Sequence, residues 1–154
     1  MGFFDKVKNY VTGGAAKVTV EAVEPALGGP FRVKIHAAVE ETEIPIKEVY
    51  LKIVSMETVV IKDVEIAQQV EDKMETVRQD IENTTTAHDQ KIEVAGEQVL
   101  QANQEYDWET TVTLPENALP SFYGITAQHE WKILAGLSTS GNDPDSGWVE
   151  IKLA

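Results

Sequence analysis

Apolar and polar residues alternate along much of this sequence, and this period of two constrains the fold more than any other feature. The clearest run is residues 31–37, in which Phe31, Val33 and Ile35 alternate with charged or polar neighbours. A strand with this pattern buries one face and leaves the other wet. The pattern recurs over residues 17–21, 49–53, 106–114, 129–137 and 149–153. Short strands of this kind predict a mostly β protein, built as one antiparallel immunoglobulin-like or arrestin-like β-sandwich.

The first 14 residues follow a different period. Their apolar residues are spaced as on one face of a helix, which predicts a short amphipathic helix over residues 3–12. Gly13 and Gly14 then end the helix and form a hinge. We therefore expect a helix-and-hinge segment over residues 1–14 and the sandwich over residues 15–154. The apolar face of the helix is a candidate partner-binding surface, formed by Phe3, Phe4, Val7, Tyr10 and Val11.

The polar middle of the chain, residues 62–90, fits two structures. Ile66, Val70, Met74, Val77 and Ile81 fall at helical spacing. Residues 84–86 are three consecutive threonines, which prefer a strand, and the whole stretch can also be extended. The pattern leaves both alternatives open.

Charge and composition exclude several classes of protein. The 154 residues include 26 acidic and 13 basic side chains, for a formal net charge of −13. This balance argues against a nucleic-acid binder, whose affinity comes largely from Lys and Arg. Cysteine is absent, which rules out disulfides and Cys-ligated zinc and fits a cytoplasmic location. No apolar run reaches the roughly 18–20 residues that a membrane span needs.

No catalytic or cofactor motif is present. The sequence has no nucleophile elbow, no phosphate-binding Gly-rich loop and no pair of histidines at metal-binding spacing. His36 and His129 lie within predicted strands, where a structural role is expected. Ser121, Ser138 and Ser146 lie in turns, where their hydroxyls suit bonds to the backbone. We therefore expect no enzymatic activity, no cofactor and no metal site.

Two further features have a structural and a functional interpretation. Asn142, Asp143 and Asp145 could supply part of a calcium shell, but Asn-Asp-Pro-Asp is also an ordinary turn sequence. Trp108, Trp131 and Trp148 are expected in the core or at its edge. An exposed Trp148 would instead be a binding anchor.

Two segments resemble a known superfamily. Residues 108–137 contain Leu114-Pro115, then Leu119-Pro120-Ser121-Phe122-Tyr123-Gly124, then a strand over residues 131–137. This order resembles the first sandwich of arrestin-like proteins. Phe3-Phe4, the following lysines and residues 14–18 (Gly-Ala-Ala-Lys-Val) resemble the start of bacterial sporulation-control proteins, which belong to that superfamily. Those proteins carry two tandem sandwiches, whereas this chain has room for one.

The resemblance implies an adaptor or regulatory scaffold without catalysis. Its protein partner would bind through an exposed sheet edge or through the N-terminal helix. A homodimer is one candidate assembly, because a single sandwich leaves edge strands free. The alternative is a peripheral protein that docks on a membrane surface through the N-terminal helix.

Overall fold

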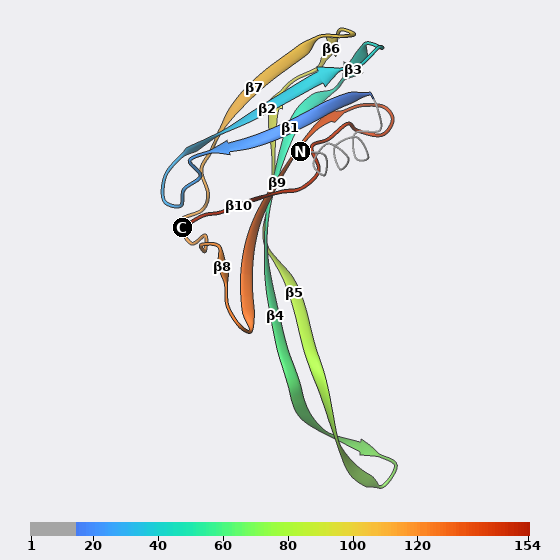
Figure 1. The fold of residues 1–154 in the computed structure, drawn as a ribbon, viewed down its shortest axis with the longest axis vertical. Coiled ribbons are helices and arrows are strands. Elements are labelled where there is room, and N and C mark those ends of the chain that lie inside the picture. Colours follow the sequence, from blue (N-terminus) through green and yellow to red (C-terminus); the bar gives the residue numbers. More distant parts are fainter. Residues whose placement is uncertain (1–14) are drawn as a thin grey trace.

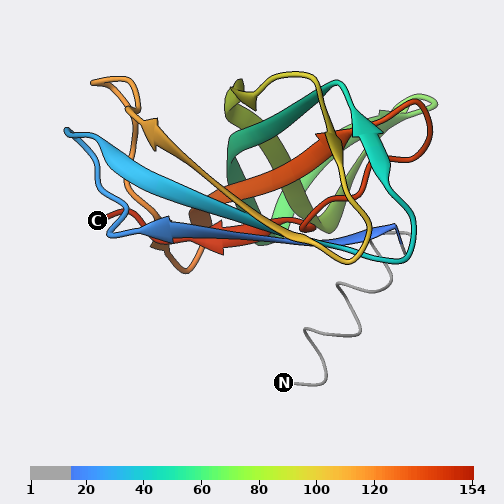
Figure 2. The same cartoon turned by 90° about the horizontal axis from the view of Figure 1, so that it is seen from above.

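Two antiparallel sheets pack face to face in the computed structural model, which describes residues 15–154. The smaller sheet has the order β1 (Ala16–Val23), β2 (Phe31–Val39) and β7 (Glu105–Val112). The larger sheet has the order β10 (Val149–Ile151), β9 (Ala127–Ser138), β4 (Glu48–Val70) and β5 (Lys73–Ala95), and β8 (Phe122–Tyr123) also pairs with β9. Strands β3 (Ile44–Ile46) and β6 (Gln98–Leu100) form a small ribbon at one end. Figures 1 and 2 show the two layers and the hairpin that leaves them.

The core lies between the inner faces of the two sheets. Ile35 of β2, Leu51 and Ile53 of β4, and Ile133 and Leu137 of β9 are almost fully buried. Each belongs to an alternating run in the sequence, and its polar neighbours point outward. The prediction of a mostly β, antiparallel fold is thus confirmed, and residues 15–154 contain no helix.

The middle of the chain is extended. Residues 62–90, for which the sequence left helix and strand open, form most of a hairpin between β4 and β5. Each of these two strands has 23 residues. Backbone pairing runs from Val49↔Ala95 at the sandwich to Val70↔Lys73 at the turn, which excludes the helical alternative.

The predicted N-terminal helix and Gly hinge fall on residues 1–14, outside the described part of the chain. From residue 15 onward, no helix is long and apolar enough to cross a membrane.

Candidate functional site

The hairpin of β4 and β5 extends well beyond the sandwich. Strand β9 pairs with β4 only as far as Val59↔Ala127, whereas β4 and β5 continue to pair as far as the turn at Glu71 and Asp72. We call residues 59–83 the arm. In Figure 1 the arm projects downward from the sandwich as a two-stranded ribbon. Its residues therefore pack mainly on each other.

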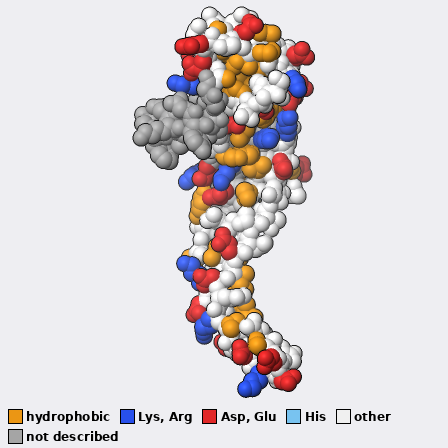
Figure 3. Space-filling view, turned by 90° about the vertical axis from the view of Figure 1, so that its right-hand side faces the viewer, with side chains coloured by type: hydrophobic (Ala, Val, Ile, Leu, Met, Phe, Trp, Pro, Cys, Tyr) orange, Lys and Arg blue, Asp and Glu red, His pale blue; other side chains and the backbone are white. Residues whose placement is uncertain are grey.

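The arm has one apolar face, because directly paired residues of an antiparallel ribbon lie on the same side. The pairs Ile61↔Ile81 and Ile66↔Val77 lie on this face. It continues the row of β4 that is buried in the sandwich at Leu51 and Ile53. We call it the inner face of the arm, and its apolar residues are Val59, Ile61, Val64, Ile66, Val70, Val77 and Ile81. The side chain of Ile61 is 44% exposed and that of Val70 is 40% exposed, so nothing in the described structure covers them. Hydrophobic side chains recur down the arm in Figure 3.

A β-bulge keeps these residues on one face. Ile61 pairs with Ile81 and Val64 pairs with Gln79, so Lys62 and Asp63 of β4 oppose a single residue of β5. Asp63 has a φ of 57°, in the left-handed region that a short polar side chain tolerates. The extra residue shifts the alternation of β4 from odd to even positions.

Polar contacts hold the bulge on the opposite face. Arg78 Nη1 lies 3.0 Å from Asp63 Oδ2, and Arg78 Nη2 lies 3.7 Å from Glu65 Oε2. The Asp63 N–H donates to Asp80 Oδ1 at 2.9 Å. These groups are exposed, so each ion pair contributes little stability. Their contribution is to fix the position of the bulge.

The outer edge of β5 has no strand paired to it in the described part of the chain. Strand β5 ends the strand order of the larger sheet, and it contains no proline. Apart from the ladder with β4, no backbone hydrogen bond within residues 15–154 reaches β5. Residues 83–88 (Asn-Thr-Thr-Thr-Ala-His) carry no Asp, Glu, Lys or Arg, and Glu82 and Asp89 flank them. This stretch is opposite the part of β4 that β9 also supports.

Two of the three histidines, His88 and His129, line one pocket beside Trp131. His36 Nδ1 donates to Asp107 Oδ1 at 2.8 Å on the outer face of the smaller sheet. The rings of His88 and His129 both lie next to that of Trp131, with centroids 5.3 and 5.5 Å from its centroid. His129 is buried and its Nδ1 donates to the Pro120 carbonyl at 2.8 Å, while its Nε2 has no hydrogen-bond partner. The structural role expected for His129 is therefore observed.

Two of the three serines expected in turns, Ser121 and Ser146, bond to the backbone as predicted, whereas Ser138 is the last residue of β9. Ser146 Oγ donates to the Gly147 carbonyl at 2.8 Å and accepts from the Ala135 N–H at 3.0 Å. Ser121 Oγ accepts from the Leu153 N–H at 3.1 Å. Neither hydroxyl bonds to a histidine, so no nucleophile with a base is assembled at these serines.

The acidic turn uses its carboxylates internally. Asp143 accepts from the Tyr50 hydroxyl at 3.1 Å and from the Thr139 N–H at 2.9 Å, and Asp145 accepts from the Gly147 N–H at 2.8 Å. Burial and the bond to Asp143 raise the pKa of Tyr50 above its usual value. The turn interpretation of Asn142–Asp145 therefore fits better than a calcium shell. Across residues 15–154, no group of three or more His, Asp or Glu is placed to hold a metal ion.

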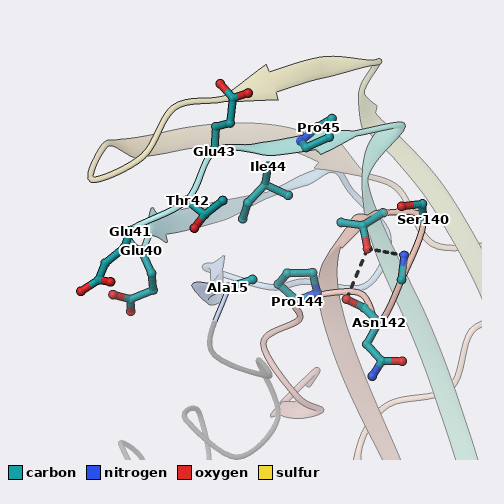
Figure 4. A pocket seen from close by; sticks show the side chains of 12 residues that line it. Ala15, Glu40, Glu41, Thr42, Glu43, Ile44, Pro45, Ser140, Asn142 and Pro144 are labelled. Atoms are coloured by element: carbon teal, nitrogen blue, oxygen red, sulfur yellow. Dashed lines mark hydrogen bonds between the residues drawn. The ribbon is translucent and has the colours of Figure 1, made fainter.

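A hollow lies beside this turn. It has a volume of about 710 Å³ between residues 40–45 and residues 139–144. In Figure 4 the carboxylate of Glu43 points to the opposite side from those of Glu40 and Glu41. Because the acidic groups diverge, they do not define a binding point.

Two of the three tryptophans are placed as expected. Trp131 is 1% exposed and Trp108 is half-buried on β7. Trp148 is 49% exposed, which contradicts the prediction of a core position. It follows the turn at Gly147 and precedes β10, a strand of only three residues.

The predicted partner-binding residues Phe3, Phe4, Val7, Tyr10 and Val11 lie outside residues 15–154. The arm was not predicted from the sequence. Its sequence signal was the β-branched run that continues to Ile61.

Comparison with known proteins gives a fold rather than a function. No protein-family model and no curated protein matches the sequence. The structure superposes on the sporulation control protein of Bacillus subtilis with a TM-score of 0.61 and 21% identity, over 91% of this chain and 49% of that one. The chain thus spans about half the length of that protein. A family 123 glycoside hydrolase from Clostridium perfringens superposes with a TM-score of only 0.42 and 8% identity, over 90% of this chain and 27% of that one.

The second likeness is too weak to bear on activity. The chain therefore has the fold of the matched half of that sporulation control protein.

Proposed function

We propose that the protein is a non-enzymatic regulatory scaffold that binds an extended segment of a partner protein along the outer edge of β5. The free edge of this strand is the observation that carries the proposal. Natural sheets usually shorten, charge or cover their edges, or interrupt them with proline. Strand β5 has 23 residues and no proline, so it keeps a row of backbone donors and acceptors available.

The chemistry of the edge suggests the kind of segment that fits. Added strands gain affinity from main-chain hydrogen bonds and specificity from alternate side chains. The neutral stretch over residues 83–88 favours a β-branched or small-residue centre in the partner. Glu82 and Asp89 at its two ends favour basic residues that flank this centre.

Two adjacent proline substitutions test the edge. Consecutive N–H groups of a strand point to opposite sides, so one of Thr84 and Thr85 donates toward β4 and the other toward solvent. We expect one of the variants Thr84→Pro and Thr85→Pro to keep the wild-type melting temperature. That variant has lost only the outward donor.

The readout is quantitative capture from a lysate with the full chain as bait. The proposal requires a protein that wild type enriches and that the stable proline variant no longer captures. Hydrogen exchange should also slow at residues 83–88 when that protein is added. Equal capture by wild type and the stable proline variant would contradict edge binding.

The N-terminal segment remains a second proposed contact surface. Residues 1–17 contain three lysines against Asp5, so the side-chain charge is +3 − 1 = +2, and the remaining residues then carry −13 − 2 = −15. Deleting residues 2–12 tests whether Phe3, Phe4 and Val7 contact a partner or membrane, or cover the acidic sandwich. Loss of salt-sensitive capture or vesicle binding at unchanged melting temperature supports a contact surface. A lowered melting temperature with no change in binding supports a structural cover.

A further inference from the structure

We propose that a second copy of this chain covers the inner face of the arm, with the two arms packed face to face and antiparallel about a two-fold axis. This contact is separate from the edge of β5. Face-to-face packing of two ribbons leaves the backbone groups of both outer edges free. The two surfaces can therefore be tested independently.

The arm needs a cover on physical grounds. A two-stranded ribbon is at best marginally stable in water unless its apolar face packs on something. Within the sandwich, the same row of β4 is covered by the smaller sheet and is fully buried at Leu51 and Ile53. From Val59 onward that cover ends, while the face still carries seven apolar residues. Val59, Ile61 and Ile81 are each more than a third exposed there.

The charges on the arm favour a copy of itself despite the net charge of −13. From Val59 to the turn, the inner face carries only two charged side chains, Lys73 and Glu75, both near the tip. At the base, Glu57 lies on the same face. The other acidic side chains of the arm lie on the opposite face, at the bulge or in the turn. Two inner faces can therefore approach with little repulsion.

The order of the paired residues selects the antiparallel arrangement. The pair Val64↔Gln79 lies midway along the inner face. A two-fold axis there places Ile66 on Ile61 of the second copy, and Glu75 on Asn83, whose amide can donate to a carboxylate. The pair Val70↔Lys73 then lies over the pair Glu57↔Thr85 of the second copy. A parallel arrangement would instead place the pair Glu57↔Thr85 over the same pair of the second copy, so that the two Glu57 carboxylates come close together.

The size of the contact predicts a reversible dimer. At about 3.3 Å per residue, the arm is about 40 Å long from Val59 to Val70. With a width of about 10–12 Å, each copy contributes about 400–500 Å². The total is close to the roughly 1,000 Å² at which specific interfaces begin. We therefore expect association in the micromolar range rather than an obligate dimer.

A matched pair of lysine substitutions tests which face is used. Ile66 and Ala67 are neighbours on β4 and point to opposite faces of the arm. In sedimentation equilibrium at physiological salt, wild type should shift from the 17.0 kDa monomer toward twice that mass as its concentration rises. Ile66→Lys should weaken this association at least tenfold, and Ala67→Lys should leave it unchanged. Circular dichroism and the melting temperature monitor folding of both variants.

A charge exchange tests the antiparallel register even if Ile66→Lys loosens the arm. Lys73→Glu and Glu57→Lys should each weaken the dimer by about 2- to 5-fold, the range expected for exposed ion pairs. The double variant should restore it.

Three outcomes would overturn the proposal. These are a wild type that stays monomeric up to millimolar concentration, equal loss of association in Ile66→Lys and Ala67→Lys, and a double charge variant no better than either single one. If wild type is monomeric and captures a protein that the Ile66→Lys variant does not capture, the inner face binds that protein instead of a second copy. Captured proteins that survive Ile66→Lys but not the edge proline would leave the β5 proposal intact.

Discussion

Trp131 connects the interior of the sandwich to one of its end loops. Its ring is almost completely buried, and its Nε1 donates to the Leu119 carbonyl at 2.8 Å. His88 and the edge of His129 pack against the ring. The side chain thus fills space between strands and also anchors the Leu119-Pro120 crossing.

Replacing Trp131 with Ala should therefore be severe. We expect Trp131→Ala to lower the free energy of unfolding by about 3–5 kcal/mol, because it leaves a large cavity and an unpaired carbonyl. Trp148→Ala is the matched control and should cost less than about 1 kcal/mol, since that ring is half exposed. Urea unfolding with an unchanged slope measures both. Similar losses for the two variants would contradict this account of the core.

His36 makes stability depend on pH. Its hydrogen bond to Asp107, helped by the charges of Asp107 and Glu105, raises the pKa of His36 above 6.5. A pKa raised in the folded state means that folding favours the protonated form. The stabilisation is complete below the unfolded-state pKa and disappears as pH rises through the folded-state pKa.

The measurement compares wild type with His36→Gln across pH. The difference in unfolding free energy should be largest near pH 5 and should vanish by about pH 9, well above the unperturbed histidine pKa. It should be small throughout because the pair is exposed. A difference that grows with pH would have the wrong sign for this ion pair.

The interior of the sandwich could be predicted from the sequence residue by residue, but contacts across the ends of the sheets could not. Alternation placed Ile35 and Ile133 inward, and both are buried. The same reasoning could not predict that Gly136 lies against the Tyr50 ring, where an added Cβ would clash with the hydroxyl oxygen. Nor could it predict that Trp148 is exposed, because the three residues of β10 are too few for alternation to show where the strand begins.

The hairpin of β4 and β5 shows why the middle of the chain was ambiguous. Val59 and Ile61 occupy odd positions, whereas Val64 and Ile66 occupy even ones, so a period of two breaks at the bulge. On β5 only Val77 and Ile81 are apolar on the inner face, and they are four residues apart, which is also a helical spacing. The pairing between β4 and β5 resolves the ambiguity, but the periodicity of a single sequence does not reveal which residues pair.

Because the arm packs mainly on itself, it should be removable. Val59 and Asn83 are a direct pair, so an Asn-Gly turn can join them in place of residues 60–82. We expect this variant to keep its far-ultraviolet circular dichroism per residue and a melting temperature within a few degrees of wild type. It should lose self-association. A collapse of the sandwich on removal of the arm would show that the arm supports the core.

At the scale of the whole molecule, stability should vary strongly along the chain. Strands β2, β4 and β9 bury their inner residues between two sheets, whereas the arm has one ladder and no second layer. Regions with few buried contacts and exposed hydrogen bonds open most easily.

Native-state hydrogen exchange measures this gradient. In dilute protein, amides of residues 60–82 should exchange far faster than those of residues 31–37, 49–55 and 131–137. Raising the concentration should slow exchange in the arm of wild type but not in the Ile66→Lys variant. Uniform protection along β4 would contradict a division between sandwich and arm.

The bulge also limits how such an arm can change length during evolution. Inserting or deleting one residue in β4 beyond Val59 would move every later side chain of that strand to the opposite face of the arm. The apolar residues would then lie on the charged face. Two residues added to each strand keep the phase, and so does a single insertion that carries its own bulge. Natural variants of this protein should therefore differ in arm length by matched pairs of residues. Where they differ by an odd number in β4, the Lys62-Asp63 bulge should be gained or lost with the change.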